Sequence, residues 1–114
     1  MSYIYRHAKV ERVIDGDTVV ISVDMGNKIT WLENFRLNGI DAADKDKVKK
    51  DAATAYITNL LASGISHIET FKPDKFGRWL VDIYVPVNDG ELKINQVMVT
   101  EGYALPYFGG KKEQ

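Results

Sequence analysis

The sequence predicts one small domain that is mainly β and belongs to the α+β class, with five strands, a helix after the third strand and a short helix near the C-terminus. Three observations support this prediction. Short runs rich in valine and isoleucine are separated by turn residues. One stretch changes to helical spacing, and 114 residues suffice for a single core only. We therefore expect residues 1–114 to form one domain, in which residues 108–114 are a loose tail.

The first two strands are expected at residues 8–14 and 18–23, which are both rich in valine and isoleucine. Between them lies the tripeptide Asp15-Gly16-Asp17, which is typical of a tight turn. Glycine at such a turn is available for a positive φ angle, so we assign that role to Gly16.

The third strand is expected at residues 28–38 and completes a local meander. Phe35 and Leu37 share one parity with Trp31, so Arg36 is predicted to point to the opposite face of the strand. Glu33 has the same parity as these apolar residues, which indicates a bulge or a bend close to it.

The pattern changes to helical spacing over residues 46–62, where Ala53, Ile57 and Leu61 follow one another every four residues. This predicts a helix with one face towards the core. Gly64 follows directly after the last periodic residues and is expected to end the helix.

The remaining strands are expected at residues 65–71 and 78–85, with a polar loop at 72–77 between them. Residues 94–101 then read as a short helix that Gly102 ends. Five strands with a helix after the third are the layout of a closed or nearly closed OB-fold barrel, whose surfaces commonly bind oligonucleotides or oligosaccharides. Fold alone, however, assigns no chemistry.

Charge and composition exclude several classes of protein. Fifteen basic and sixteen acidic residues leave a net charge of -1, so any contact with a phosphate must depend on a local group of charges. The absence of cysteine excludes disulfides and thiolate zinc sites. The first residues contain no long apolar run, so we expect neither a signal peptide nor a membrane span, and a cytoplasmic location.

The candidate chemistry comes from charges at strand ends and turns. Carboxylates without histidine or cysteine nearby suit a hard cation, calcium or magnesium, and arginines suit the oxygens of a phosphate. The combination indicates phosphoryl transfer. A structural alternative is that Arg36 pairs with Asp41 at a strand end and that Asp44 caps the following helix. The residues concerned are Asp15, Asp17, Arg36, Asp41, Asp44 and Arg78.

Four short motifs together resemble the staphylococcal nuclease (thermonuclease) family in order and spacing, over residues 10–107. Each motif alone is weak, but four in register within one small domain are specific. They are Val13-Ile14-Asp15-Gly16-Asp17-Thr18-Val19, Phe35-Arg36-Leu37 with Gly39-Ile40-Asp41, Asp74-Lys75-Phe76-Gly77-Arg78, and Asn95 with Glu101-Gly102-Tyr103-Ala104.

The resemblance implies an activity and a role for individual residues. Family members cleave DNA and RNA with the help of one calcium ion. In this chain the ion would be held by Asp17, Asp41 and the backbone carbonyl of Ala42, with Asp15 in support. Arg36 and Arg78 match the arginines that bind the phosphate. Lys75 and Tyr107 resemble residues that contact a terminal phosphate, and Leu80 matches an apolar residue beside a base.

The chain departs from the family at Ala43-Asp44, where Pro-Glu is usual. Asp44 would therefore orient the attacking water with a side chain one methylene shorter, and a displacement of about 1 Å in a catalytic group costs about a hundredfold in rate. The ending near Gln114 resembles the compact versions found in phages and bacteria.

We therefore expect a calcium-dependent nuclease that hydrolyses the phosphodiester bonds of DNA, RNA or both by attack of water. The alternative is a catalytically impaired domain of the same kind that binds nucleic acid or a protein partner. No membrane partner is expected. A monomer is favoured, and a homo-oligomer stays open.

Overall fold

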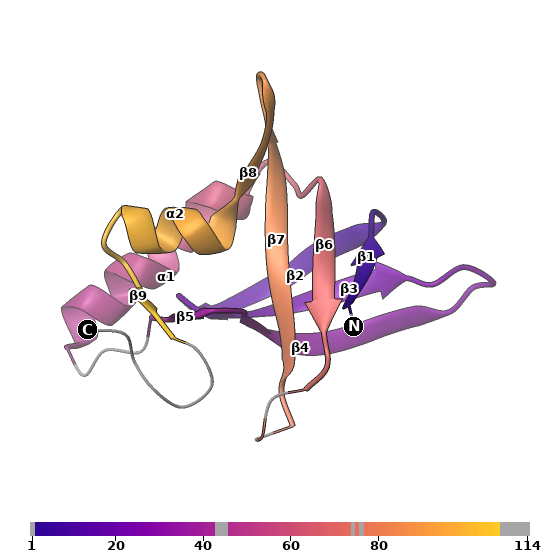
Figure 1. The fold of residues 1–114 in the computed structure, drawn as a ribbon, viewed down its shortest axis with the longest axis horizontal. Coiled ribbons are helices and arrows are strands. Elements are labelled where there is room, and N and C mark those ends of the chain that lie inside the picture. Colours follow the sequence, from indigo (N-terminus) through magenta and orange to yellow (C-terminus); the bar gives the residue numbers. More distant parts are fainter. Residues whose placement is uncertain (1, 43–45, 74, 76, 108–114) are drawn as a thin grey trace.

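The computed structural model describes residues 2–42, 46–73, 75 and 77–107 (Figure 1). The expected α+β class is confirmed, since two helices accompany a mainly β chain in this part of the molecule. The expected tail at residues 108–114 lies outside the described residues. In order, the elements are β1 (Ser2–Tyr5), β2 (Ala8–Asp15), β3 (Thr18–Asp24), β4 (Thr30–Leu37), β5 (Ile40–Asp41), α1 (Lys47–Leu61), β6 (His67–Phe71), β7 (Trp79–Val87), β8 (Gly90–Lys93), α2 (Ile94–Thr100) and β9 (Leu105–Pro106).

The strands form a mixed sheet and not the closed five-stranded barrel that the sequence predicted. Among the described residues the sheet has seven strands in the order β1-β6-β7-β4-β3-β2, with β8 paired to β7. A second sheet pairs β5 with β9. The prediction missed β1, β5, β8 and β9 because each has four residues or fewer, which is too short for alternation to identify. The β4–β7 pairing is parallel, and the other pairings are antiparallel.

The predicted meander of β2, β3 and β4 is confirmed, but its irregularities lie elsewhere. The register of β3 and β4 runs without a shift from Thr18 opposite Arg36 to Asp24 opposite Thr30, so the bulge expected near Glu33 is wrong. The shifts occur in β2 instead, between Val10 and Arg12 and between Val13 and Asp15. The carboxylate of Glu33 is half-buried and accepts hydrogen bonds from the Trp31 indole at 3.3 Å and from the Asn34 amide at 3.1 Å.

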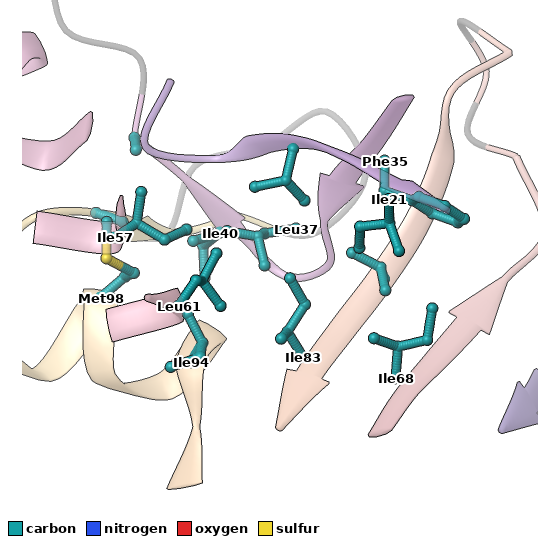
Figure 2. Packing of buried hydrophobic residues seen from close by; sticks show 14 of the residues in the cluster. Ile21, Phe35, Leu37, Ile40, Ile57, Leu61, Ile68, Ile83, Ile94 and Met98 are labelled. Atoms are coloured by element: carbon teal, nitrogen blue, oxygen red, sulfur yellow. The ribbon is translucent and has the colours of Figure 1, made fainter. Parts of the chain in front are cut away.

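The core lies between one face of the sheet and the two helices. Figure 2 shows Ile57, Leu61, Ile94 and Met98 of the helices beside sheet and turn residues such as Leu37, Ile40 and Ile83. Ala53, Ile57 and Leu61 are the buried residues of α1, as their four-residue spacing predicted. The helix lies next to β5 at one end of the molecule, while the β3–β4 hairpin extends away from it (Figure 1). Neither helix of the described residues combines the length and the apolar character that crossing a membrane would require.

Candidate active site

The turn between β2 and β3 is shaped by close packing and not by an unusual backbone angle. Gly16 is buried but is absent from the glycines with positive φ, so the conformational role predicted for it is wrong. A Cβ atom at Gly16 would lie 2.8 Å from the Cβ of Ala53 and 3.0 Å from that of Ala42. The lack of a side chain therefore lets α1 and the end of β5 approach the turn that carries Asp15 and Asp17.

Asp17 is fixed by hydrogen bonds to three neighbouring segments. Its Oδ2 atom accepts the backbone N–H of Ala42 at 3.0 Å, and its carbonyl accepts the N–H of Leu37 at 2.7 Å. Its Oδ1 atom accepts the hydroxyl of Thr18 at 3.0 Å. These bonds connect the first turn with the end of β4 and with the residue after β5. The carbonyl of Ala42 was predicted from the sequence as an ion ligand, but the role of its amide was not, because a backbone donor leaves no signal in the sequence.

Arg36 lies between the two carboxylates that the sequence predicted to share a site. Its Nη2 atom is 3.7 Å from Oδ2 of Asp17 and 3.8 Å from Oδ1 of Asp41. Arg36 points to the face of β4 opposite Phe35, as predicted, yet only 8% of it is exposed. The ring of Tyr107 lies 5.0 Å from the guanidinium carbon, at a distance suited to a cation–π contact.

Tyr107 reaches this position through the small second sheet. β9 pairs with β5 at Ile40 opposite Pro106, and the Tyr107 amide donates to the carbonyl of Gly39 at 2.8 Å. The turn before β5 is held by Asn95, whose side-chain amide donates to the carbonyl of Asn38 at 2.9 Å. From the sequence, Asn95 had no role beyond its place in a motif. Its position among apolar residues at the start of a helix could have indicated its role, because a buried amide requires hydrogen-bond partners.

The two acids of the first turn have opposite pKa shifts. Burial raises the pKa of Asp17 above its ordinary 3.8, and the hydrogen bond and charge of Asp15 act in the same direction. Burial also raises the pKa of Asp15, but its hydrogen bonds with Asp17 and Thr18 and the nearby charge of Lys50 outweigh burial and lower it overall. The pair therefore holds one proton more readily than two separate carboxylates would, and a cation beside it would favour release of that proton.

The donor set fits a hard cation. Arg36 is beyond hydrogen-bonding distance of both carboxylate oxygens, so it supplies charge to Asp17 and Asp41 without a direct bond from that nitrogen. Carboxylate and carbonyl oxygens are the ligands that calcium and magnesium prefer. Within the described part of the chain, however, no three acidic or histidine side chains are grouped closely enough to hold a metal by themselves. The arrangement suits an ion that shares its remaining coordination with water or with a phosphate.

Arg78 and Leu80 are brought to the same face of the sheet as Arg36, where β4 and β7 pair in the middle of the sheet. Leu80 is directly opposite Arg36 in the parallel β4–β7 register. Arg78 precedes Leu80 by two residues, so both have the parity of Arg36. Arg78 is exposed just before β7, and Lys75 is exposed in the connection between β6 and β7.

Asp44 lies outside the described residues, but the structure answers the question of the helix cap. The N-cap of α1 is Asp46, whose side chain accepts the N–H of Val48 at 2.9 Å. The structural alternative in which Asp44 caps this helix is therefore wrong. The other alternative, a pairing of Arg36 with Asp41, is present geometrically, but Arg36 is shared equally with Asp17.

Comparisons with known proteins identify the family and several relatives of this chain. A family model described as staphylococcal nuclease homologue matches residues 34–114. Two curated relatives, from Escherichia coli O157:H7 and Escherichia coli, are each named an uncharacterized endonuclease and are 34% identical over 101 residues, which cover 89% of this chain and 61% of theirs. An uncharacterized protein of Methanocaldococcus jannaschii is 25% identical over 122 residues, with 89% of this chain and 59% of its own covered. The chain thus spans about three fifths of the length of these relatives.

Proposed function

Because this chain belongs to the staphylococcal nuclease family, we propose that it is a calcium-dependent nuclease that hydrolyses phosphodiester bonds of DNA, RNA or both. The relatives named endonuclease support a hydrolase that acts on nucleic acid. One structural observation carries the proposal. The buried guanidinium of Arg36 lies within 4 Å of carboxylates from two separate segments, Asp17 and Asp41, and exposed Arg78 directly precedes β7, the strand next to that of Arg36.

In this proposal Asp17, Asp41 and the carbonyl of Ala42 hold one calcium ion, and Asp15 supports them through the backbone of Asp17, whose N–H donates to Oδ1 of Asp15 at 3.1 Å. When bound, the ion neutralises charge on a phosphate oxygen and lowers the pKa of coordinated water. The raised pKa of Asp17 is consistent with this role, because a buried carboxylate beside a second one gains most from a nearby cation.

The two arginines bind the phosphate in this proposal. Arg36 is held by its carboxylate neighbours and by Tyr107, so its position is set before a substrate arrives. A preorganised guanidinium stabilises the negative charge that grows on the phosphoryl oxygens in the transition state. Arg78, on the neighbouring strand, contacts the same phosphate from the solvent side. Lys75 and Tyr107 contact a terminal phosphate, and Leu80 lies against a base.

Asp44 orients the attacking water and accepts its proton. The water oxygen forms the new bond to phosphorus, and the leaving oxygen departs with its bonding electron pair. The N-cap of α1 is Asp46, so this role of Asp44 does not compete with a cap. Its shorter side chain predicts a slower enzyme than one with glutamate at this position.

The proposal is tested by incubating the protein with single-stranded DNA and with RNA in the presence of calcium, followed by addition of a chelator. Cleavage with calcium that stops with chelator is the expected result. Thermal unfolding with and without calcium provides a second measurement, since an ion that binds only the folded state raises the midpoint. Calcium binding and nucleic-acid binding without cleavage would instead support the impaired-domain alternative.

A further inference from the structure

A second cluster of charged residues lies far from the acids, at the distal end of the β3–β4 hairpin. The cluster lines a groove of about 500 Å³. Its walls come from the start of β2, the end of β3 and the turn that leads into β4. We call this cavity the distal groove. Its charged and titratable residues are Arg6, His7, Lys9, Asp24 and Lys28.

The distal groove is positive although the chain as a whole has a net charge of -1. Arg6, Lys9 and Lys28 are cations, and among the described residues Asp24 is the one acid of the lining. Arg6 also interacts electrostatically with Glu91, which lies outside the lining. The Oδ1 atom of Asp24 accepts the backbone N–H of Gly26 at 2.9 Å, so one of its carboxylate oxygens already has a hydrogen-bond partner within the turn. Such a local excess of cations is suited to a polyanion and not to a neutral ligand.

The groove faces the same side of the sheet as Arg36. Thr18 is opposite Arg36, and Asp24 is opposite Thr30, with an unbroken register between them. Because side chains alternate, these even-numbered residues share the face opposite the buried Val19, Ile21 and Val23. Asp24 lies six positions after Thr18. At about 3.3 Å per position, the groove is about 20 Å from Arg36 along the strand.

A second hollow connects the distal groove with the region next to the site. It is lined by residues of β2, β3 and β4 and shares Ser22 and Thr30 with the distal groove. It extends to Val20 and Asn34, which lie one alternation from the Thr18 and Arg36 pair. Its charged residues are Glu11, Arg12 and Glu33. Glu11 accepts the Ser22 hydroxyl at 2.7 Å, and Glu33 accepts the Trp31 indole N–H at 3.3 Å, so both carboxylates have a partner within the hairpin. The two hollows thus adjoin one another on the outer surface of the hairpin and lead towards Arg36.

The backbone of the hairpin turn is strained at a cation. Asn27 and Lys28 have φ angles of 54° and 65°, in the left-handed region that is rarely occupied by residues other than glycine, asparagine and aspartate. The two residues are the centre of a hairpin turn, in which the N–H of Ile29 donates to the carbonyl of Gly26 at 2.9 Å. Hairpin turns of this kind require a positive φ at both central residues. The turn thus accounts for the conformation of Lys28, which it places at the groove, and asparagine tolerates this conformation better than lysine does.

We propose that the distal groove is a second anion subsite, which binds the sugar–phosphate backbone of the nucleic-acid substrate about 20 Å from the phosphate at Arg36. The choice of substrate rests on the proposed function. Arg6, Lys9 and Lys28 neutralise phosphates in this subsite, and the strand between the two regions follows the outer surface of β3 and β4. At about 3.4 Å of rise per phosphate, the separation corresponds to about six nucleotides of a strand stacked as in B-form DNA, and to fewer of an extended single strand. Short substrates therefore cannot occupy both regions.

The test compares two substitutions in the same turn. Lys28→Gly removes both the cation and the strained lysine, whereas Asn27→Gly relieves the same kind of backbone strain and leaves the groove charges intact. Binding of a labelled long single-stranded oligonucleotide is measured in chelator, over a series of salt concentrations. We expect Lys28→Gly to raise the thermal midpoint, to weaken binding and to reduce the slope of log K against log salt by about 0.7. Asn27→Gly is expected to leave affinity and slope unchanged.

A combined Arg6→Gln, Lys9→Gln and Lys28→Gln variant is expected to reduce the slope for a long oligonucleotide by about two. It should also abolish the gain in affinity that a long oligonucleotide has over one too short to reach both regions. A slope that is unchanged in this folded variant would overturn the subsite. So would an equal loss of affinity for short and long oligonucleotides.

The outcome is separable from the proposed nuclease activity, because binding is measured without the ion. Cleavage together with binding of long oligonucleotides that does not depend on these cations would support the proposed function and contradict the subsite. A change in slope without cleavage would support the subsite and contradict the proposed function.

Discussion

Gly16 and Ala53 are so close that a Cβ atom added to the glycine would lie 2.8 Å from the Cβ of the alanine. This distance is shorter than real Cβ contacts permit, and neither neighbour is a flexible side chain that could move aside. Helix α1 therefore rests directly on the turn that carries Asp15 and Asp17. The geometry of the proposed ion site depends on the absence of one methyl group.

Gly16→Ala is therefore expected to lower the free energy of unfolding by about 1–3 kcal/mol, which is typical of overpacking in a core. It should also reduce cleavage, because the turn must move away from α1. Denaturant unfolding and initial rates measure the two effects. The double variant Gly16→Ala with Ala53→Gly removes the shorter contact and should lose less stability than the sum of the single changes. Simple additivity would show that the two positions are not in steric conflict.

Arg36→Lys should abolish most of the activity while the fold is retained. Lysine keeps the positive charge near Asp17 and Asp41 but loses the planar fork of arginine and its contact with Tyr107. Removal of one preorganised donor from a transition state costs about 100- to 1,000-fold in rate. We expect a loss of that size in kcat, with circular dichroism unchanged. Lys47→Arg, at the exposed ion pair with Asp51 on α1, is the control, and a comparable loss there would contradict a specific role for Arg36.

Asp44 and Asp46 should separate catalysis from stability. Asp46→Ala removes the N-cap of α1, so it should lower the free energy of unfolding by about 1 kcal/mol and leave kcat unchanged well below the midpoint. Asp44→Ala should lower kcat and leave the free energy of unfolding unchanged. Asp44→Glu should increase kcat if the shorter carboxylate limits the reaction. A decrease in kcat for Asp44→Glu would mean that the site is adapted to aspartate.

Asp82 predicts a pH dependence of stability away from the active site. Burial raises the pKa of Asp82 above 3.8, although the charge of Lys93, 3.4 Å from its Oδ2 atom, acts in the opposite direction. A carboxyl whose folded-state pKa is raised binds its proton more tightly in the folded chain. Its stabilising contribution is thus complete below about 3.8, the unfolded value, and is lost as pH rises through the raised pKa.

Asp82→Asn should remove this dependence, because an amide does not titrate. The fold should be retained, since the amide oxygen still accepts the hydrogen bond that Asn95 donates to Asp82 at 3.1 Å. We expect the stability of the native protein relative to the variant to fall as pH increases from acid to neutral. Denaturant midpoints of both proteins over that range measure the difference. A difference that grows with pH would show that the Lys93 ion pair dominates over burial.

Local pattern was sufficient for much of the fold. The valine- and isoleucine-rich runs predicted β2 and β3, and the four-residue spacing of Ala53, Ile57 and Leu61 predicted α1 to within one residue at each end. Strands of four residues or fewer were not predictable, because so short a segment contains too little alternation. Closure of the sheet also depends on which edges pair, and a strand pattern does not specify its partner.

The sequence by itself determined which chemical groups this protein has for its proposed work: carboxylates at two turns, arginines on two strands, and an order of motifs that identifies the family. Only the tertiary structure decided how those groups are placed. It located Asp17 and Asp41 around one guanidinium, made Asp46 the helix cap in place of Asp44, and showed that Gly16 is required by packing and not by φ. The physical reason is that residue type and local spacing depend on neighbours in the chain. Distances between Arg36, Ala53 and the first turn depend on contacts between segments far apart in sequence, which form only when the core packs.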